Sequence, residues 1–398
     1  MKVLVLGGDG YLGWPTAMYL SNQGHEVAVL DNFIKRKWEL EVGVGPLRPL
    51  PDLNERIETW EEVTSNRIDS YIGDLKNYHF VEETLEDYQP DAIIHYGEQC
   101  AAPYSMIDID HIVETQINNI QGTLNVTYAM KKTCPDAHLL KLGTMGEYGT
   151  PNIEIQEGFL EVEKDGRKDI LPFPKQPGSF YHLSKVHDSQ NLMFASKIWD
   201  LRITDLNQGV VYGVQTDETE LHDDLHTAFR YDEIFGTALN RFCTQAVAGM
   251  PLTVYGKGGQ QRGFLNIRDT LQCIELALET PAEQGEFRVF NQFTEMFSVQ
   301  ELAELVQERG NDLGLDVEIQ HLDNPRVESE EHFFDADNTG LMELGLEPHY
   351  LSDVLIDSML ESIMDYEHLI KEDVILPNVE WDTADSRDKI GSRGDHSS

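Results

Sequence analysis

Short apolar runs alternate with amphipathic segments along the first half of the chain. The runs at 2–6 and 26–31 predict buried parallel strands, with a helix over 16–22 between them. Further apolar runs at 91–95 and 139–143 predict later strands, and each is followed by a loop and a helical pattern. This order is typical of an α/β protein with a doubly wound, Rossmann-type parallel sheet.

The pattern changes after about residue 212. Residues 215–235 are polar and acidic, with little sign of a strand. Beyond them the pattern predicts a helix over 237–248, a strand over 252–255, a loop over 256–263, a helix over 298–308 and a strand over 317–321. These elements predict a smaller C-terminal α+β lobe that lies over the sheet.

The chain of 398 residues is long enough for two or three structural units. We expect residues 1–212 to form the sheet domain, completed by parts of 264–292. Residues 213–263 and 293–376 would then form the smaller, substrate-binding lobe. The end of the chain, 377–398, is rich in Asp, Ser and Gly, and we expect it to be a disordered tail.

The charge balance is extreme, since 71 Asp and Glu residues face 30 Lys and Arg residues and give a formal net charge of −41. At low salt so many like charges repel one another and loosen a compact state, whereas molar salt shortens the Debye length to about 3 Å and mutes the repulsion. We therefore predict a salt-loving source, a halophilic archaeon, with an ordinary acidic protein as the alternative. Such a surface repels phosphate, which disfavours nucleic acid or an anionic membrane as a partner.

No apolar run approaches the roughly 18 residues of a membrane span, and the run at 3–6 is too short for the core of a signal peptide. The four cysteines lie far apart without a Cys-x-x-Cys pair, which favours free thiols in a reducing compartment over a disulfide framework or a zinc site. We therefore expect a cytoplasmic protein without a bound metal and without membrane insertion.

Gly7, Gly10 and Gly13 follow the first predicted strand in a G-x-x-G-x-x-G rhythm. Such a turn lets the backbone approach a pyrophosphate closely, and the following helix directs its N–H groups at the same anion. Asp31 ends the next strand, 18 residues after Gly13, near the spacing of a carboxylate that binds an adenosine ribose. It favours NAD, because a carboxylate repels the extra phosphate of NADP. The alternatives are a plain turn and an Asp31 that only caps the next segment.

Tyr181 and Lys185 lie four residues apart, so on a helix they share one face. A nearby ammonium stabilises a phenolate and lowers the tyrosine pKa from about 10 towards neutrality, as a base that removes a sugar hydroxyl proton requires. The alternative is simple packing, since Tyr-x-x-x-Lys is common on amphipathic helices. The glycine turn upstream and Thr144 at the end of a predicted strand favour the catalytic interpretation.

These residues identify the chain as a member of the extended short-chain dehydrogenases/reductases that act on nucleotide sugars. Within them it resembles the UDP-sulfoquinovose synthases most closely, over roughly residues 1–360. The resemblance rests on segments such as GGDGYLGWPTA, HYGEQCAAPYSMID, NNIQGTLNV, KLGTMGEYGTPNI, SFYHLSKVHDS, DLNQGVVYGVQTDET and LTVYGKGGQQRGFLNIRDT. TMGEYGTPNI and the GEQ-x-x-APYSMID pattern are specific to this branch.

The resemblance implies a reaction in which UDP-glucose and sulfite give UDP-sulfoquinovose. Tyr181 takes the C4 hydroxyl proton while the C4 hydride passes to NAD+, water leaves across C5 and C6, sulfite adds at C6, and the hydride returns to C4. The resemblance also implies a homodimer that pairs through a four-helix contact. The alternatives are another epimerase or 4,6-dehydratase acting on a UDP-hexose and, outside enzymes, an NAD-binding sensor.

By position, the resemblance also implies the binding residues. Thr144 would hydrogen-bond the reacting hydroxyl, and Lys185 would also hold the nicotinamide ribose. The cofactor set comprises Gly7, Asp9, Gly10, Tyr11, Gly13, Asp31, Asn32, Arg36, Asp74, Leu75, Asn119, Tyr181, Lys185 and Val211. The substrate set comprises Cys100, Thr144, Met145, Gln208, Arg241, Gln261, Arg262, Arg326 and Glu328, the last five around the uridine diphosphate. Surface ion pairing is the alternative role of the arginines.

Ordinary sugar 4,6-dehydratases carry Thr-Asp-Glu before a Tyr-Gly pair, and Met145 and Gly146 stand in the places of that acid and base. Glu147 and His182 are the candidates for moving the C5 and C6 protons. Their alternatives are loop bracing for Glu147 and packing for His182. Met145 is expected to shape the pocket around C6 of the sugar.

Cys100 departs from the resemblance, because the family usually carries an arginine there, a natural partner for sulfite. A small neutral thiol removes that charge, so sulfite capture must use other groups or a different nucleophile is accepted. Inert filler is the alternative role of this thiol. Glu98 and Gln99, which precede it, are further candidates for approaching the reacting end of the sugar.

Overall fold

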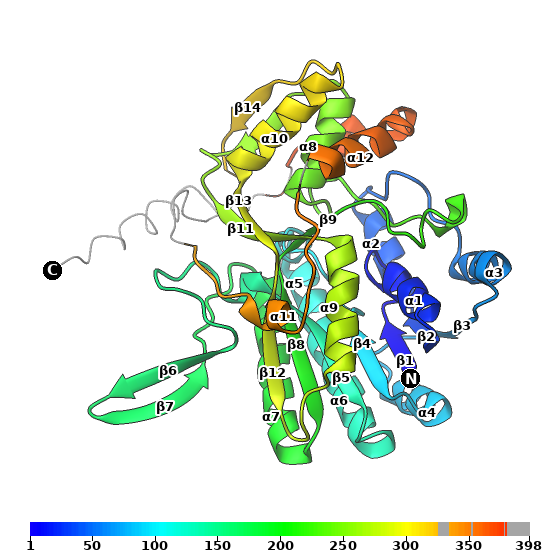
Figure 1. Ribbon diagram of the computed structural model, residues 1–398, viewed down its shortest axis with the longest axis vertical. Coiled ribbons are helices and arrows are strands. Elements are labelled where there is room, and N and C mark those ends of the chain that lie inside the picture. Colours follow the sequence, from blue (N-terminus) through cyan, green and yellow to red (C-terminus); the bar gives the residue numbers. More distant parts are fainter. Residues whose placement is uncertain (325–333, 352, 378, 380–398) are drawn as a thin grey trace.

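A seven-stranded sheet, parallel throughout, is built from strands between residues 2 and 292 (Figure 1). The computed structural model describes residues 1–324, 334–351, 353–377 and 379. The strands lie in the order β3 (Ile68–Ile72), β2 (Glu26–Asp31), β1 (Lys2–Leu6), β4 (Ala92–His95), β5 (His138–Thr144), β8 (Arg202–Gln208) and β12 (Phe287–Gln292). The chain order reverses between β1 and β4, which opens a crevice at the carboxyl ends of these strands. The predicted doubly wound, Rossmann-type sheet is confirmed.

Helices cover both faces of this sheet, and the central strands are apolar on both sides for that reason. Val3 and Val5 of β1 point into a core shared with α1 (Gly13–Asn22), α3 (Leu53–Thr64) and α9 (Ile267–Glu279). Leu4 and Leu6 point into the opposite core, which is shared with α4 (Tyr78–Tyr88), α6 (Gly122–Thr133) and α7 (Phe180–Trp199). The short helices α2 (Ile34–Glu41) and α5 (Ile109–Gln116) follow β2 and β4 along the chain.

The smaller α+β lobe has its own core. Two small sheets form it, β13 (Glu295–Ser298) with β11 (Gln261–Asn266) and β9 (Val210–Tyr212), and β10 (Leu252–Tyr255) with β14 (Ile319–Leu322). They pack with α8 (Ala238–Val247), α10 (Val299–Asp312) and α12 (Asp353–Met364) around an apolar cluster that includes Phe242, Leu302 and Leu360. β10 begins and ends as predicted, whereas β14 begins two residues later than the apolar pattern suggested.

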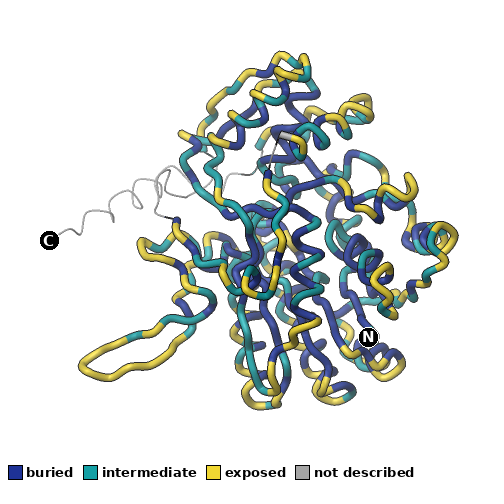
Figure 2. Tube along the Cα trace, in the orientation of Figure 1, coloured by how far each residue is buried: buried dark blue, intermediate teal, exposed yellow. Residues whose placement is uncertain are grey.

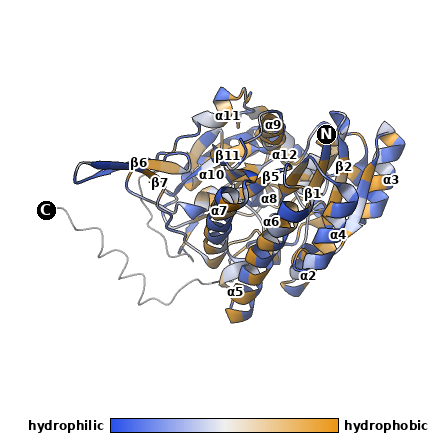
Figure 3. Cartoon of the chain, turned by 90° about the horizontal axis from the view of Figure 1, so that it is seen from below, coloured by the Kyte–Doolittle hydropathy of each residue, from blue (hydrophilic) through white to orange (hydrophobic). Residues whose placement is uncertain are grey.

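A β-hairpin that the hydrophobic pattern did not indicate stands out from the body (Figures 1 and 2). It consists of β6 (Phe159–Lys164) and β7 (Arg167–Pro172), which pair with each other alone and are hydrophilic towards the tip (Figure 3). At the tip, Asp165 and Gly166 both have positive φ, 53° and 74°. Asp-Gly is the residue pair that favours such a two-residue turn, so this dipeptide was the available signal.

Helix α1 begins at Gly13 rather than at the predicted Thr16, because the glycine turn leads into the helix without a separate loop. Among the described residues, no helix is long and apolar enough to cross a membrane. Of the expected tail 377–398, all but two residues lie outside the described part of the chain. How the chain divides into folding units stays a prediction.

The acidic excess predicts that stability depends on salt. We expect the midpoint of thermal unfolding to rise by on the order of 10 °C between 0.1 M and 3 M KCl, because screening removes repulsion from the folded state. Calorimetry at stepwise KCl concentrations measures this. An uncharged osmolyte at matched osmolarity is the control, since it does not screen charge. A midpoint that stays constant or falls with KCl contradicts the prediction.

Candidate active site

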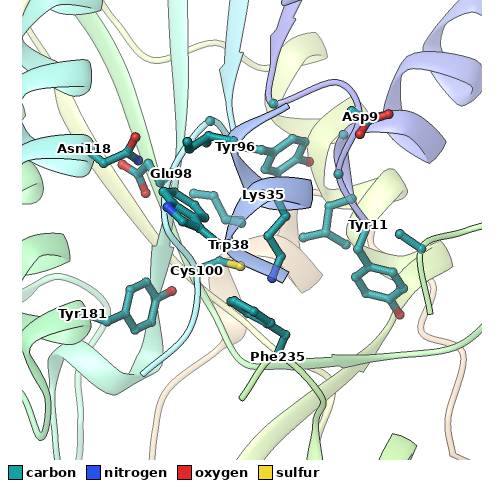
Figure 4. A pocket seen from close by; sticks show the side chains of 18 of the residues that line it. Asp9, Tyr11, Lys35, Trp38, Tyr96, Glu98, Cys100, Asn118, Tyr181 and Phe235 are labelled. Carbon is teal, nitrogen blue, oxygen red and sulfur yellow. The ribbon is translucent and has the colours of Figure 1, made fainter. Parts of the chain in front are cut away.

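A cavity of about 390 Å³ lies at the carboxyl ends of the central strands, where the strand order reverses (Figure 4). The glycine turn after β1 and the end of β2 form one side of it, and the end of β5 with the start of α7 forms the other. The chain between 208 and 240 closes the cavity from the direction of the lobe. This is the place where doubly wound sheets bind ligands.

The glycine turn is packed so closely that side chains do not fit. Gly7 has φ of 83°, and a Cβ atom there would lie 2.8 Å from the backbone carbon of Tyr96. A Cβ atom on Gly13 would lie 2.0 Å from the carbonyl oxygen of Gly7. The N–H of Gly10 donates to that same oxygen at 3.1 Å. The turn therefore has the shape that brings a pyrophosphate to the N-terminus of α1, and the residues fit NAD.

Asp31 lies at the end of β2 and lines the cavity. Its carboxylate accepts hydrogen bonds from the N–H of Asp9 at 2.9 Å and from the N–H of Phe33 at 2.7 Å. Burial raises the pKa of Asp31, and both hydrogen bonds oppose that rise. Asp31 thus braces the turn before α2 but does not cap that helix, and the two hydrogen bonds hold its carboxylate at the cavity wall. A place beside the adenosine ribose is compatible with it.

Arg36 braces the glycine turn through Asp9, which itself lines the cavity. Arg36 donates two hydrogen bonds to the Asp9 carboxylate, at 2.7 Å and 2.8 Å, and a third at 2.7 Å to the carbonyl of Pro51. The fully buried Arg56 adds a contact to Asp9 at 3.2 Å. Arg36 is not among the residues that line the cavity. Its expected cofactor contact stays a prediction, and within the described residues the guanidinium is held by carboxylate and carbonyl oxygens.

Tyr181 and Lys185 lie on the same face of α7, at its N-terminal end. Tyr181 and Thr144 both line the cavity, and the Thr144 hydroxyl is near enough to lower the pKa of Tyr181. Lys185 is buried, forms an ion pair with Glu98, and donates to the carbonyl of Leu142 at 2.6 Å. The sequence-predicted catalytic trio is thus brought together, with Glu98 as a fourth member.

The expected lowering of the Tyr181 pKa is wrong for the chain alone. Burial raises the pKa of Tyr181 above its usual value, and the neighbouring Cys100 adds to the rise. The nearby hydroxyl of Thr144 opposes it. Spacing along a helix could not show that Lys185 is paired with Glu98, and this ion pair compensates the ammonium charge that was expected to act on the phenol.

Glu147 is fully buried and turned away from the cavity. One oxygen lies 3.3 Å from Lys141 Nζ and accepts from the N–H of Thr144 at 3.3 Å. The other pairs with Lys175 and accepts from the hydroxyl of Ser189 at 3.0 Å. Burial alone would raise the pKa of Glu147, but the two ammonium groups hold it at about 2. Of the two roles considered, this geometry favours loop bracing beneath Thr144 over proton transfer.

Comparisons with known proteins assign the chain to a family. The model of the NAD dependent epimerase/dehydratase family matches residues 3–291. The chain belongs to this family. UDP-sulfoquinovose synthase of spinach chloroplasts is 54% identical over 96% of this chain and 79% of its own length. UDP-sulfoquinovose synthase of Sulfolobus acidocaldarius is 44% identical over 96% of this chain and 98% of its own. Both place the chain in that branch of the family, and its cofactor is NAD.

Solved epimerases share the fold. UDP-glucose 4-epimerase of Thermotoga maritima, solved with UDP-glucose, superposes with a TM-score of 0.68 at 20% identity, over 92% of this chain and 99% of that one. UDP-glucose 4-epimerase of Thermus thermophilus, solved with NAD, superposes with a TM-score of 0.64 at 22% identity, again over 92% and 99%. This likeness shows that the chain shares the arrangement of helices and strands of these epimerases.

Several predicted residues do line the cavity: Gly7, Asp9, Gly10, Tyr11, Gly13, Asp31, Asn32, Asp74, Leu75, Cys100, Thr144, Tyr181, His182, Gln208 and Val211. Asn119 does not, and Asn118 takes its place. The side chain of Asn119 hydrogen-bonds the backbone of Gln99 and, at 2.9 Å, the hydroxyl of Ser184. It therefore braces the loop after β4 against α7. A sequence of two adjacent asparagines does not show which one faces inward.

The other predicted substrate residues lie elsewhere. Met145 is buried in an apolar cluster with Tyr148 and Phe173, away from the cavity wall. Arg241, Gln261 and Arg262 belong to the lobe and do not line the cavity. Arg326 and Glu328 lie outside the described residues. The contacts expected to the uridine diphosphate therefore stay predictions.

The structure also brings in residues that the sequence did not single out. Lys35 and Trp38 of α2 reach the cavity, and so do Arg230, Phe235 and Asn240 from the polar segment and the start of α8. Nothing in the composition of 215–235 signalled that it turns back to the cofactor side. The part of the chain that the structure describes holds no cluster of His, Cys, Asp and Glu suited to a metal.

Glu147→Gln tests the bracing role. Removing the charge leaves Lys141 and Lys175 buried with one carboxylate fewer, so we expect the free energy of unfolding to fall by about 3 kcal/mol. Denaturant titration measures it. Glu161→Gln is the matched control, because Glu161 pairs with Lys168 on the exposed hairpin and its loss costs under about 1 kcal/mol. A variant of unchanged stability that has lost activity contradicts the prediction and returns Glu147 to proton transfer.

Proposed function

We propose that this chain is an NAD-dependent enzyme that converts UDP-glucose and sulfite to UDP-sulfoquinovose. The observation that carries the proposal is that Tyr181 and Thr144 line the crevice, with the buried Lys185 one turn further along α7. This arrangement occurs in a chain that is 54% and 44% identical to two UDP-sulfoquinovose synthases over nearly its whole length.

Tyr181 is the base for the C4 hydroxyl of the glucose unit. NAD+ supplies the acceptor for the C4 hydride and later its source, so the cofactor is regenerated in each turnover. Thr144 lies near the hydroxyl of Tyr181 and is placed to hydrogen-bond the reacting C4 oxygen. Lys185 lies one turn further along α7, and its ion pair with Glu98 fixes the position of the ammonium. The C4 ketone that results acidifies the C5 proton, so water can leave across C5 and C6.

His182 is the remaining candidate for moving the C5 and C6 protons. Its ring lines the cavity one residue after Tyr181, and its Nδ1 lies 3.0 Å from the hydroxyl of Ser179. Its Nε2 lies close to Gly146 in the loop after β5. Met145 and Gly146 stand where ordinary dehydratases carry their acid and base, but Met145 is buried in an apolar cluster. His182 is therefore better placed than Met145 to reach the C5 and C6 protons.

Incubation of the enzyme with UDP-glucose and sulfite in molar KCl tests the reaction. We expect mass spectrometry to show a sulfonated UDP-hexose only when sulfite is present. Tyr181→Phe is expected to lower kcat by about 100- to 10,000-fold while NAD stays bound, because the base is lost and the fold is kept. A product with the mass of UDP-glucose or of a dehydrated hexose, with or without sulfite, indicates an epimerase or a 4,6-dehydratase instead.

We also infer a homodimer in the cytoplasm of a halophile. Ile109 and Val113 of α5 and Phe194 and Ile198 of α7 are exposed, and these two helices pack together, which supports a helical contact with a second copy. Light scattering in molar KCl gives the mass of the assembly. Phe194→Glu is expected to shift it to the monomer, and a wild-type monomer contradicts the inference.

A further inference from the structure

Lys35 places a buried ammonium in the cavity wall. The residue lies near the start of α2, and its side chain extends towards Cys100 and Phe235 (Figure 4). Its Nζ atom is shielded from solvent and donates no hydrogen bond within the described residues, although the side chain as a whole is 21% exposed. An ammonium has three donors, and a buried donor without an acceptor is costly. The site is therefore incomplete without an acceptor in the cavity.

The neighbouring charges do not supply that acceptor. The Glu39 carboxylate lies 3.5 Å from Lys35 Nζ, without a hydrogen bond, and it is also paired with Arg230. Asp232 adds a second negative charge, so two cations face two carboxylates. Burial lowers the pKa of Lys35 to about 7 despite both carboxylates. A small anion in the cavity would satisfy the donors and restore the ammonium charge.

Cys100 shows which end of the cavity this is. The thiol interacts electrostatically with Lys35 and with Tyr181, so it lies between them, and it is exposed to the cavity. Tyr181 marks the carbon that is oxidised, so Lys35 faces the sugar across a small neutral side chain. Arg36, the next residue of α2, is already held by Asp9. Lys35 lies beside Glu39 and over the Phe235 ring, but unlike Arg36 it donates no hydrogen bond within the described residues.

We propose that Lys35 binds the sulfite of this reaction, its ammonium holding the sulfite oxygens in the space that Cys100 leaves open. This inference rests on the proposed function. The lone pair on sulfur forms the C–S bond at C6, the electron pair of the C5–C6 double bond takes up a proton at C5, and no oxidant or reductant is consumed. Binding through oxygen leaves the sulfur free to react. Lys35 is a substrate-binding residue in this scheme.

Two other anions compete for this assignment, the pyrophosphate of NAD and that of the nucleotide sugar. The three ligands are separable, since each has its own measurable binding. Lys35→Met keeps the length of the side chain and removes the charge. We expect the KM for sulfite to rise about 10- to 100-fold, as loss of a charge-assisted hydrogen bond predicts. The KM for UDP-glucose and the content of bound NAD are expected to change by less than about twofold.

Lys37→Met is the matched control, because it removes the same charge from the same helix at an exposed position outside the cavity. Lys35→Arg is expected to keep the KM for sulfite within about threefold of the wild type, since a guanidinium also binds oxyanions. An unchanged KM for sulfite in Lys35→Met overturns the proposal. Loss of NAD, or a raised KM for UDP-glucose with normal sulfite kinetics, assigns the ammonium to a pyrophosphate and overturns it as well.

Cys100→Arg provides a second, independent variant that leaves Lys35 in place. A further cation beside the sulfite is expected to lower the KM for sulfite about threefold or more, and to restore part of the loss when combined with Lys35→Met. An unchanged or raised KM for sulfite in the single variant contradicts the proposal even if Lys35→Met does not fold. If the wild type forms no sulfonated product at all, the proposed function fails, and that result is distinct from failure of the Lys35 assignment.

Discussion

The close approach of two backbone loops is the constraint on which the site depends. The turn after β1 and the loop after β4 leave neighbouring strands on opposite sides of the point where the strand order reverses. They touch at Gly7 and Tyr96, without room for a side chain between them. This contact sets the floor of the cofactor crevice. It also fixes Glu98, two residues beyond Tyr96, where it meets Lys185 of α7. Cofactor site and catalytic residues thus share one anchor.

Much of the sheet domain could be predicted, because its strands are buried on both faces and read as continuous apolar runs. The glycine turn, Asp31, Thr144 and Tyr181 could be placed for a related reason: each lies where a strand ends or a helix begins. The roles of side chains that depend on a partner far along the chain could not be predicted. Asn119 and Arg36 were expected at the cofactor, and each is held by a residue that only the fold brings near.

The smaller lobe shows more clearly what could not be predicted from the sequence. Its core elements followed from periodicity, yet the polar segment 215–235 carries Arg230 back to Glu39 on α2. No local pattern signals a contact over such a separation in sequence. The Lys141 and Glu147 pair is another case, because a lysine inside an apolar strand gives no sign of its carboxylate partners until β8 and α7 are packed against it. Sequence identified the kinds of residue, and packing decided their roles.

The buried ion pairs have one more consequence. A chain with so few cations commits several of them to the interior around its site, among them Arg56, Lys141, Lys185 and Arg230. Mobile ions in the medium weaken attractions between exposed groups but hardly reach pairs enclosed by protein. The protein surface and the active site therefore respond to salt in different ways. Salt weakens the repulsion between surface charges, while the buried ion pairs keep the geometry of the active site. The geometry around the catalytic residues can therefore stay constant over a wide range of salt concentrations.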